Sequence, residues 1–218
     1  MGYTCERVGT FAALIAFCIS ASLATVALFT SHWFDSAILT KTGGIAAGAH
    51  VNAGLFWGER VLEYENGARK YNFSVVTEVR AGYSFMARPV WCFCVFFAAL
   101  GLLWVGVGSF VALFAAISRK RQSVAGPIGI YLWSLLALIS FSACVLIYYI
   151  QFMATIKNNV LLQTHLDAGL STQDQARLGT SFYMMLAALA ALYFPPTFIF
   201  FSHQQQRKAR QNAKISNL

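Results

Sequence analysis

The sequence has few charged residues. Asp, Glu, Lys and Arg make up 11% of its 218 positions, against about 25% in a typical soluble domain. Aromatic residues are abundant, with 19 phenylalanines alone. So little polar side-chain surface cannot cover a soluble globule of this size. The composition therefore predicts an all-α membrane protein with lipid as the solvent for most of the chain.

Charge is missing altogether from four long stretches, at residues 8–31, 89–118, 122–156 and 178–202. Each is at least as long as the roughly 20 residues that an α-helix needs to cross the hydrocarbon core. We therefore expect four transmembrane helices, near residues 8–30, 90–117, 128–153 and 180–202. A cleaved signal peptide is the alternative for the first stretch, but its apolar run exceeds the usual length of about 7–15 residues.

These helices imply a single membrane domain over residues 1–218. The expected connections are outer loops at residues 31–89 and 154–179, an inner loop at 118–127 and a tail at 203–218. Within the four stretches there is no ionisable Asp, Glu, Lys, Arg or His. Since such residues mark ion pathways and transport sites inside membranes, a pore or transporter is disfavoured.

The distribution of Lys and Arg predicts the orientation. The N-terminus, the inner loop and the tail hold one acidic residue, Glu6, and these basic residues: Arg7, Arg119, Lys120, Arg121, Arg207, Lys208, Arg210 and Lys214. Basic residues in short segments near helix ends mark the cytoplasmic side. We expect a multi-pass plasma-membrane protein with both termini in the cytoplasm, and anionic lipid as the partner of these cations. A nucleic-acid partner is the rival interpretation of the net charge of +8, and it fits this dispersed pattern less well.

Cysteine is missing from both expected outer loops. The five cysteines all lie in or beside expected helices, so no disulfide is predicted on the oxidising side. Cys5, just before the first expected span, is a candidate palmitoylation site. The scattered His, Cys and Asp residues show no metal-ligand spacing or nucleophile motif, and we expect no catalytic residues, no metal and no cofactor.

Small residues and prolines indicate how the helices pack. Ala12, Ala16, Ser20 and Ala24 recur every four residues, which places them in one stripe where another helix can approach closely. Pro195 and Pro196 remove two backbone donors from the fourth span, so we expect a kink in its last turns.

The first outer loop carries the signature of a β-hairpin. The runs "VLEYE" and "RKYNFSVV" flank Asn66-Gly67, a pair typical of two-residue hairpin turns. In the second run Tyr71, Phe73 and Val75 would share one face. Asn72-Phe73-Ser74 is the one N-glycosylation sequon of the chain, and Asn72 is its candidate acceptor.

Four spans, a large first outer loop with strands and a smaller second one resemble the claudin-like superfamily. Its first loop has a Trp soon after helix 1, then Gly-Leu-aromatic and usually two cysteines. Trp33 and Gly54-Leu55-Phe56 match, whereas the cysteine pair is missing. The resemblance implies a claudin-like four-helix bundle with a small extracellular antiparallel sheet. We expect Trp33, Gly54, Leu55 and Phe56 to hold that sheet to the bundle.

Within the superfamily the chain is most similar to clarins. The similar segments are "AILTKTG" at residues 37–43, "GLFWGERVLEYENGAR" at 54–69 and "GPIGIYLW" at 126–133. Clarins typically have Cys at the places of Thr40 and Tyr64, and both are replaced together. This joint loss implies a first loop without the usual bridge, as in a divergent or invertebrate member.

The resemblance implies a non-enzymatic role as a structural or accessory organiser of sensory or synaptic membrane complexes, with channel and actin-cytoskeleton association. A claudin-type adhesion or barrier protein and a dedicated ion-channel auxiliary subunit are the alternatives. The terminal Ser216-Asn217-Leu218 has the pattern that cytoplasmic PDZ scaffolds bind. Ser216 and Leu218 are therefore a candidate PDZ ligand.

Overall fold

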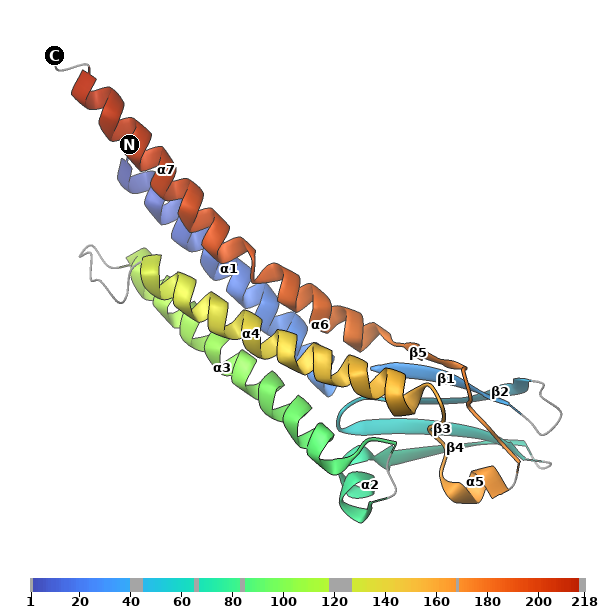
Figure 1. The fold of residues 1–218 in the computed structure, drawn as a ribbon. Coiled ribbons are helices and arrows are strands. Elements are labelled where there is room, and N and C mark those ends of the chain that lie inside the picture. The colour runs from blue at the N-terminus through green and yellow to red at the C-terminus, as the bar shows by residue number, and fades with distance from the viewer. Residues whose placement is uncertain are drawn as a thin grey trace. The chain divides into compact units, whose positions relative to one another are not determined.

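The computed structural model describes residues 2–39, 45–64, 67–82, 85–117, 127–167 and 169–215, which are mostly helical with one small antiparallel sheet (Figure 1). They fall into two compact units. The helical unit comprises Met1–Leu23, Ala99–Phe141 and Ala187–Leu218. The sheet unit comprises Ala24–Ala98 and Ser142–Leu186.

Among the described residues, four helical segments are long and apolar enough to cross a membrane: Val8–Phe29, Arg88–Ile117, Ile128–Ile156 and Thr180–Ser202. The helices that form them are α1 (Gly2–Phe29), α3 (Arg88–Ile117), α4 (Pro127–Gln151), α6 (Thr180–Ala191) and α7 (Phe194–Ile215). A helix satisfies its backbone donors and acceptors internally, as a lipid solvent requires. The predicted four-pass pattern is thus confirmed as to helix number, length and apolarity.

Some helix ends differ from the prediction. The last helix continues to Ile215, where a tail was expected from residue 203. Likewise, α4 passes into a single π-helical turn, η1 (Phe152–Ile156), in which the Lys157 N–H donates to the carbonyl of Phe152 at 2.9 Å. This turn lengthens the third span beyond the predicted end at residue 153.

The helix of the fourth span is interrupted just before the two prolines, a few residues earlier than the kink that was predicted in its last turns. The helix breaks before the prolines, between the end of α6 and the start of α7, and the Leu192 N–H there bonds only three residues back, to Leu189, at 3.2 Å. Pro195 and Pro196 lie in the first turn of α7, where a missing N–H leaves no bond unmade. A proline ring also clashes with the carbonyl four residues before it, which places the break on the N-terminal side.

In the helical unit, small residues allow close approach of aromatic rings and helix backbones. A Cβ at Gly108 would lie 2.7 Å from the ring of Phe17, and one at Gly101 would overlap the ring of Phe141. The Ser20 hydroxyl donates to the carbonyl of Ala188 at 2.9 Å. Small-residue contacts and interhelical hydrogen bonds of this kind are how helices associate in lipid.

The predicted small-residue stripe of α1 therefore packs, at least in part, within the chain. Ala16, Ser20 and Ala24 are buried, while Ala12 is half-buried. Because Ser20 already bonds to Ala188, this stretch of the stripe is not open to a partner's helix.

The described residues of the sheet unit form five strands, all antiparallel, in the order β4-β3-β2-β1-β5. They are β1 (Phe34–Leu39), β2 (Ile45–Ala53), β3 (Trp57–Tyr64), β4 (Gly67–Ser74) and β5 (Ala176–Leu178). The first loop contributes four of them and the second loop contributes β5. The expected small antiparallel sheet is confirmed, and it is larger than the single hairpin that the sequence signalled.

The hairpin of β3 and β4 corrects two details. Its register pairs Tyr64 with Gly67, so Gly67 belongs to the strand rather than to the turn. Asn66 lies outside the described residues. Val75 was expected in the strand, but it begins the helix α2 (Val75–Ala81), and its N–H donates to the carbonyl of Phe56 at 3.0 Å.

Two short helices complete the sheet unit. One is α2, which ends at Gly82 with φ of 82°, the left-handed conformation that glycine adopts without steric cost. The other is α5 (Gln163–Asp167), in the second loop.

Candidate functional site

Trp33 is the central side chain of the sheet unit. It is fully buried, and its indole N–H donates to the carbonyl of Ala27 near the end of α1, at 2.7 Å. Its ring meets that of Tyr148 edge-on with centroids 4.7 Å apart, and that of Phe182 at 6.3 Å. Within the sheet unit, Trp33 thus joins β1 to the neighbouring ends of α1, α4 and α6.

Gly54 and Leu55 lie where β2 meets the end of α1. A Cβ at Gly54 would overlap the carbonyl oxygen of Thr30, so only glycine permits this approach. Leu55 is fully buried, and its carbonyl accepts a hydrogen bond from the indole N–H of Trp91 in α3 at 2.8 Å.

Phe56 adds aromatic contacts to this junction between β2, α1 and α3. Its half-buried ring stacks on Phe29 of α1 with centroids 5.7 Å apart and meets Trp91 of α3 edge-on at 6.4 Å. The structure therefore brings the four predicted first-loop residues together between the sheet and the helix ends of the same unit.

The sheet has two unlike faces. Directly opposed residues of antiparallel strands point to the same side, so the register assigns every strand residue to one face. We call covered face the side that bears these buried residues: Phe34, Ser36, Ile38, Val51, Ala53, Gly58, Arg60, Leu62 and Ala176. The same side bears the half-buried Phe73 and Leu178 and, on the edge strand, the exposed Arg69 and Tyr71. We call open face the side that bears Asp35, Ala37, His50, Asn52, Trp57, Glu59, Val61, Lys70, Asn72, Ser74 and Arg177.

A buried ion pair lies on the covered face. The Arg60 guanidinium of β3 donates two hydrogen bonds to the Glu78 carboxylate of α2, at 2.6 and 2.8 Å. Both side chains are over nine-tenths buried, and the guanidinium carbon lies 3.8 Å from the ring centroid of Phe73. The pair fastens α2 to the sheet through a two-pronged contact that only arginine provides.

His165 of α5 belongs to the same electrostatic environment. Burial lowers the pKa of His165, the positive charge of Arg60 lowers this pKa further, and the Glu78 carboxylate partly offsets both. Its buried Nδ1 and the buried Nε of Arg60 have no hydrogen-bond partner among the described residues. The neutral imidazole is therefore the form that this environment favours.

The open face carries a polar row that crosses all five strands. The register places Arg177 of β5 opposite Asp35 of β1, and Asp35 opposite Asn52 of β2. Asn52 in turn lies opposite Glu59 of β3, which lies opposite Asn72 of β4. Arg177 and Asn72, at the two ends, are exposed.

Hydrogen bonds organise the middle of this row. The His32 imidazole Nδ1 is 2.9 Å from a carboxylate oxygen of Asp35, and the Asn52 amide nitrogen donates to the Ser31 carbonyl at 3.4 Å. The Asn52 amide oxygen is buried and lacks a partner among the described residues. Towards β4, the Lys70 ammonium is 2.7 Å from a Glu59 carboxylate oxygen.

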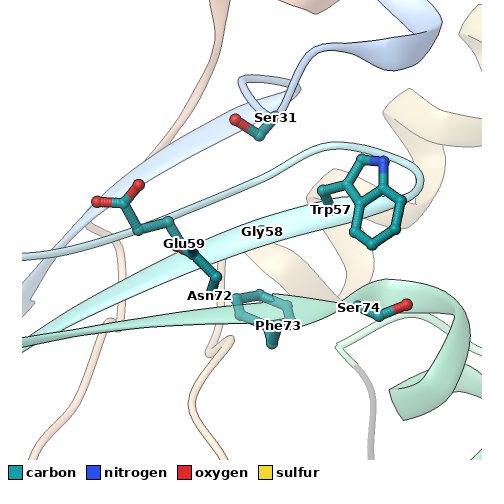
Figure 2. A pocket seen from close by; sticks show the side chains of 7 residues that line it. All are labelled: Ser31, Trp57, Gly58, Glu59, Asn72, Phe73 and Ser74. Atoms are coloured by element: carbon teal, nitrogen blue, oxygen red, sulfur yellow. The ribbon is translucent and has the colours of Figure 1, made fainter.

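A hollow of about 440 Å³ opens at the β3–β4 end of the polar row. Figure 2 shows its lining side chains, from Ser31 after α1, from β3 and from β4: Ser31, Trp57, Gly58, Glu59, Asn72, Phe73 and Ser74. Its lining combines hydroxyl, amide and carboxylate groups with the indole of Trp57, whose side chain is well exposed. Such a mixture suits a ligand that has both hydrogen-bonding groups and an apolar face.

The remaining predicted site residues are Cys5, Ser216 and Leu218. Cys5 lies in the first turns of α1, far in sequence from the sheet unit. Ser216 and Leu218 lie outside the described residues, as does Thr40. Among the described residues, no group of three or more His, Cys, Asp and Glu side chains is arranged to hold a metal ion.

Sequence reasoning missed the ion pair and the polar row. A signal for the ion pair was available, since Arg60 alternates in phase with the buried Leu62, and Glu78 lies one turn after Val75 on the buried side of α2. Two opposite charges at inward positions predict mutual pairing. The polar row had no such signal, because its members come from strands far apart in sequence.

No protein-family model matches this chain, and no curated protein matches it. The clarin resemblance of its three short segments therefore stays a prediction.

Proposed function

We propose that this chain is a non-enzymatic, clarin-like protein of the plasma membrane that organises membrane protein complexes in sensory or synaptic cells. The observation that carries the proposal is the contrast between the two sheet faces. Most residues of the covered face are buried within the chain, whereas the open face presents a row of polar side chains. A folded surface of this kind is suited to recognising another protein.

The distribution of charge supports the orientation in this proposal. The basic residues near the ends of the apolar helices lie on the side of the two termini, and this side faces the cytoplasm under the positive-inside rule. The sheet then faces the extracellular space, where its open face meets partner ectodomains. The exposed Arg207 and Lys208 of α7 meet anionic headgroups on the inner leaflet.

The resemblance supports the class of partner. Claudin-like proteins include adhesion proteins, channel auxiliary subunits and clarins, and all share a strand-bearing first loop. The Gly-Leu-Phe and Trp33 positions lie at one junction here, as the expected anchor of such a loop requires. We therefore propose channel complexes and actin-linked scaffolds as partners, with the terminal Ser216 and Leu218 reaching a PDZ domain.

Affinity purification of the tagged full chain from sensory or neuronal tissue tests the proposal. The expected result is recovery of a channel complex and an actin-linked scaffold, from a protein that appears as puncta at the cell surface. Deletion of Leu218 should remove the scaffold and leave the channel. Continuous staining of epithelial cell borders, with recovery of adhesion proteins only, would contradict the proposal and favour a claudin-type role.

A further inference from the structure

The hollow on the open face is built around the sequon. Asn72 and Ser74, the first and third residues of Asn72-Phe73-Ser74, both line it. The register places Asn72 opposite Glu59 and Ser74 opposite Trp57. The acceptor amide therefore has a carboxylate directly across from it and an indole diagonally across from it, on the same face.

We propose that the first N-acetylglucosamine of a glycan on Asn72 occupies this hollow, with its apolar ring face on the indole of Trp57. The proposal rests on the extracellular orientation given under the proposed function. The sugar's hydroxyl and acetamide groups face the Glu59 carboxylate and the Ser31 hydroxyl. The occupant of the hollow is thus covalently attached to the wall of the hollow itself.

The attachment is a group transfer from a lipid-linked oligosaccharide. The amide nitrogen of Asn72 forms a bond to C1 of the terminal N-acetylglucosamine, and the bond between C1 and the pyrophosphate oxygen breaks. The lipid pyrophosphate leaves with the electron pair, and the amide loses one proton to the catalytic base of the transferase. Asn72 is exposed on the edge strand β4, so the folded sheet accommodates the product.

Three features of the hollow fit a sugar. Its volume of about 440 Å³ lies in the range of about 300–1,000 Å³ typical of small-molecule sites. Its polar lining supplies both donors and acceptors, as a polyol needs. Trp57 leaves 59% of its surface exposed beside the hollow, although tryptophan is highly buried on average.

A glycan at Asn72 would also help to protect the edge strand β4. The strand β4 is an edge of the sheet, since no second strand pairs with it among the residues that the structure describes. Natural edge strands are blocked by charged residues or by covering groups. Exposed Arg69 and Lys70 supply the charge, and a sugar seated at Asn72 supplies cover over the adjoining part of the open face.

Two enzymatic treatments of the full chain, expressed in glycosylating cells, test the proposal. One endoglycosidase trims the glycan to a single N-acetylglucosamine, and peptide N-glycosidase removes it entirely and converts Asn72 to aspartate. We expect the trimmed protein to keep the Tm of the intact protein in detergent. Complete removal should lower Tm by about 2–4 °C, the size expected for one aromatic contact in a chain of this length.

Two variants test whether the Tm loss on removal of the glycan depends on Trp57. Enzymatic removal of the glycan leaves aspartate at position 72, and the effect of that aspartate alone is the Tm difference between Asn72→Asp and wild type when both lack a glycan. In Trp57→Ala, complete removal of the glycan should lower Tm by no more than this difference. Tyr71→Ala is the matched control, because Tyr71 is an exposed aromatic next to Asn72 on the other face of β4. Tyr71→Ala should show the same Tm loss on complete removal of the glycan as wild type. An equal Tm loss in Trp57→Ala and wild type, or a Tm loss on trimming to one sugar, would overturn the proposal.

An unmodified Asn72 would also overturn it, and a second sequon separates this failure from a failure of the proposed function. Lys214→Thr completes an Asn-x-Thr sequon at Asn212 in the tail. If Asn212 is modified and Asn72 is not, the orientation in the proposed function is wrong as well. If neither is modified, the glycan proposal fails and the orientation in the proposed function is not contradicted.

Discussion

The covered and open faces of the sheet carry their charges in different ways. On the covered face the Arg60–Glu78 pair is bidentate and shielded from water. On the open face the Lys70–Glu59 pair is close but exposed, with 61% of the Lys70 side chain accessible. A buried charge is costly unless it is paired, whereas an exposed one is already solvated. The charges of the covered face thus contribute to folding, whereas those of the open face stay in contact with solvent.

The largest effect should come from breaking the buried pair. Glu78→Ala leaves the Arg60 guanidinium buried without a carboxylate, and we expect a loss of about 3–5 kcal/mol of folding free energy. Surface delivery of the full chain and its thermal unfolding in detergent measure this loss.

A double replacement tests whether the loss in Glu78→Ala comes from the unpaired Arg60 charge. Arg60→Met combined with Glu78→Leu removes both charges, and it should restore most of the stability because no buried charge remains unpaired. If the single and double variants were equally unstable, packing rather than charge pairing would explain the covered face.

A smaller loss is expected from crowding the covered face. Gly58→Ala places a Cβ within 2.7 Å of the Phe73 ring, which is the ring beneath the Arg60 guanidinium. We expect a cost of about 1–3 kcal/mol, measured as a fall in Tm. Gly106→Ala is the matched control, because among the described residues no atom beyond the adjoining helix backbone lies within 4 Å of the added Cβ. An equal effect of both variants would mean that the Phe73 contact is irrelevant.

Acidic pH should weaken the covered face through His165. Burial and Arg60 lower the pKa of His165 in the folded chain, while its unfolded value is about 6.5. Above about pH 6.5 the imidazole is neutral in both the folded and the unfolded chain, so His165 does not reduce folding stability there. Below it the unfolded chain takes up the proton first, and stability falls until the folded pKa is passed.

Tm measured between about pH 7.5 and about pH 5 checks this dependence. His165→Gln should flatten the profile. Identical profiles for wild type and His165→Gln would contradict the role assigned to His165.

The smallest effect should come from the open face. Lys70→Ala removes an exposed pair, and we expect a loss of less than about 1 kcal/mol that diminishes further at high salt. Titration of Tm with sodium chloride in both proteins measures it. A loss as large as that of Glu78→Ala would erase the distinction between the two faces.

The helical spans could be predicted from the sequence because their signal is local. About 20 uncharged residues in a row satisfy the length and solvation needs of a transmembrane helix by themselves. The predicted helix course differs where a residue disturbs the backbone at some distance along the chain. At Pro195 and Pro196 the clash is with carbonyls four residues earlier, so the break precedes the residues that cause it.

The sheet could be predicted only in part. The hairpin of β3 and β4 shows alternation around a turn pair, but β2 is rich in Ala and Gly, which are poor strand formers. In β1 the buried Ser36 interrupts the alternation, and β5 has only three residues from a distant loop. The polar row and the hollow depend on the register of these strands, so the sequence alone could not reveal them.

Partner recovery by a charge-reversed open face tests the central claim most directly. Lys70→Glu combined with Arg177→Glu changes two exposed residues of the open face. We predict a stability loss of no more than about 2 kcal/mol, because the new carboxylates lie beside Glu59 and opposite Asp35, with normal surface delivery. Co-purified membrane partners should fall at least about tenfold, the loss that about 1.4 kcal/mol of binding energy causes. Undiminished partner recovery at equal surface level would contradict the account.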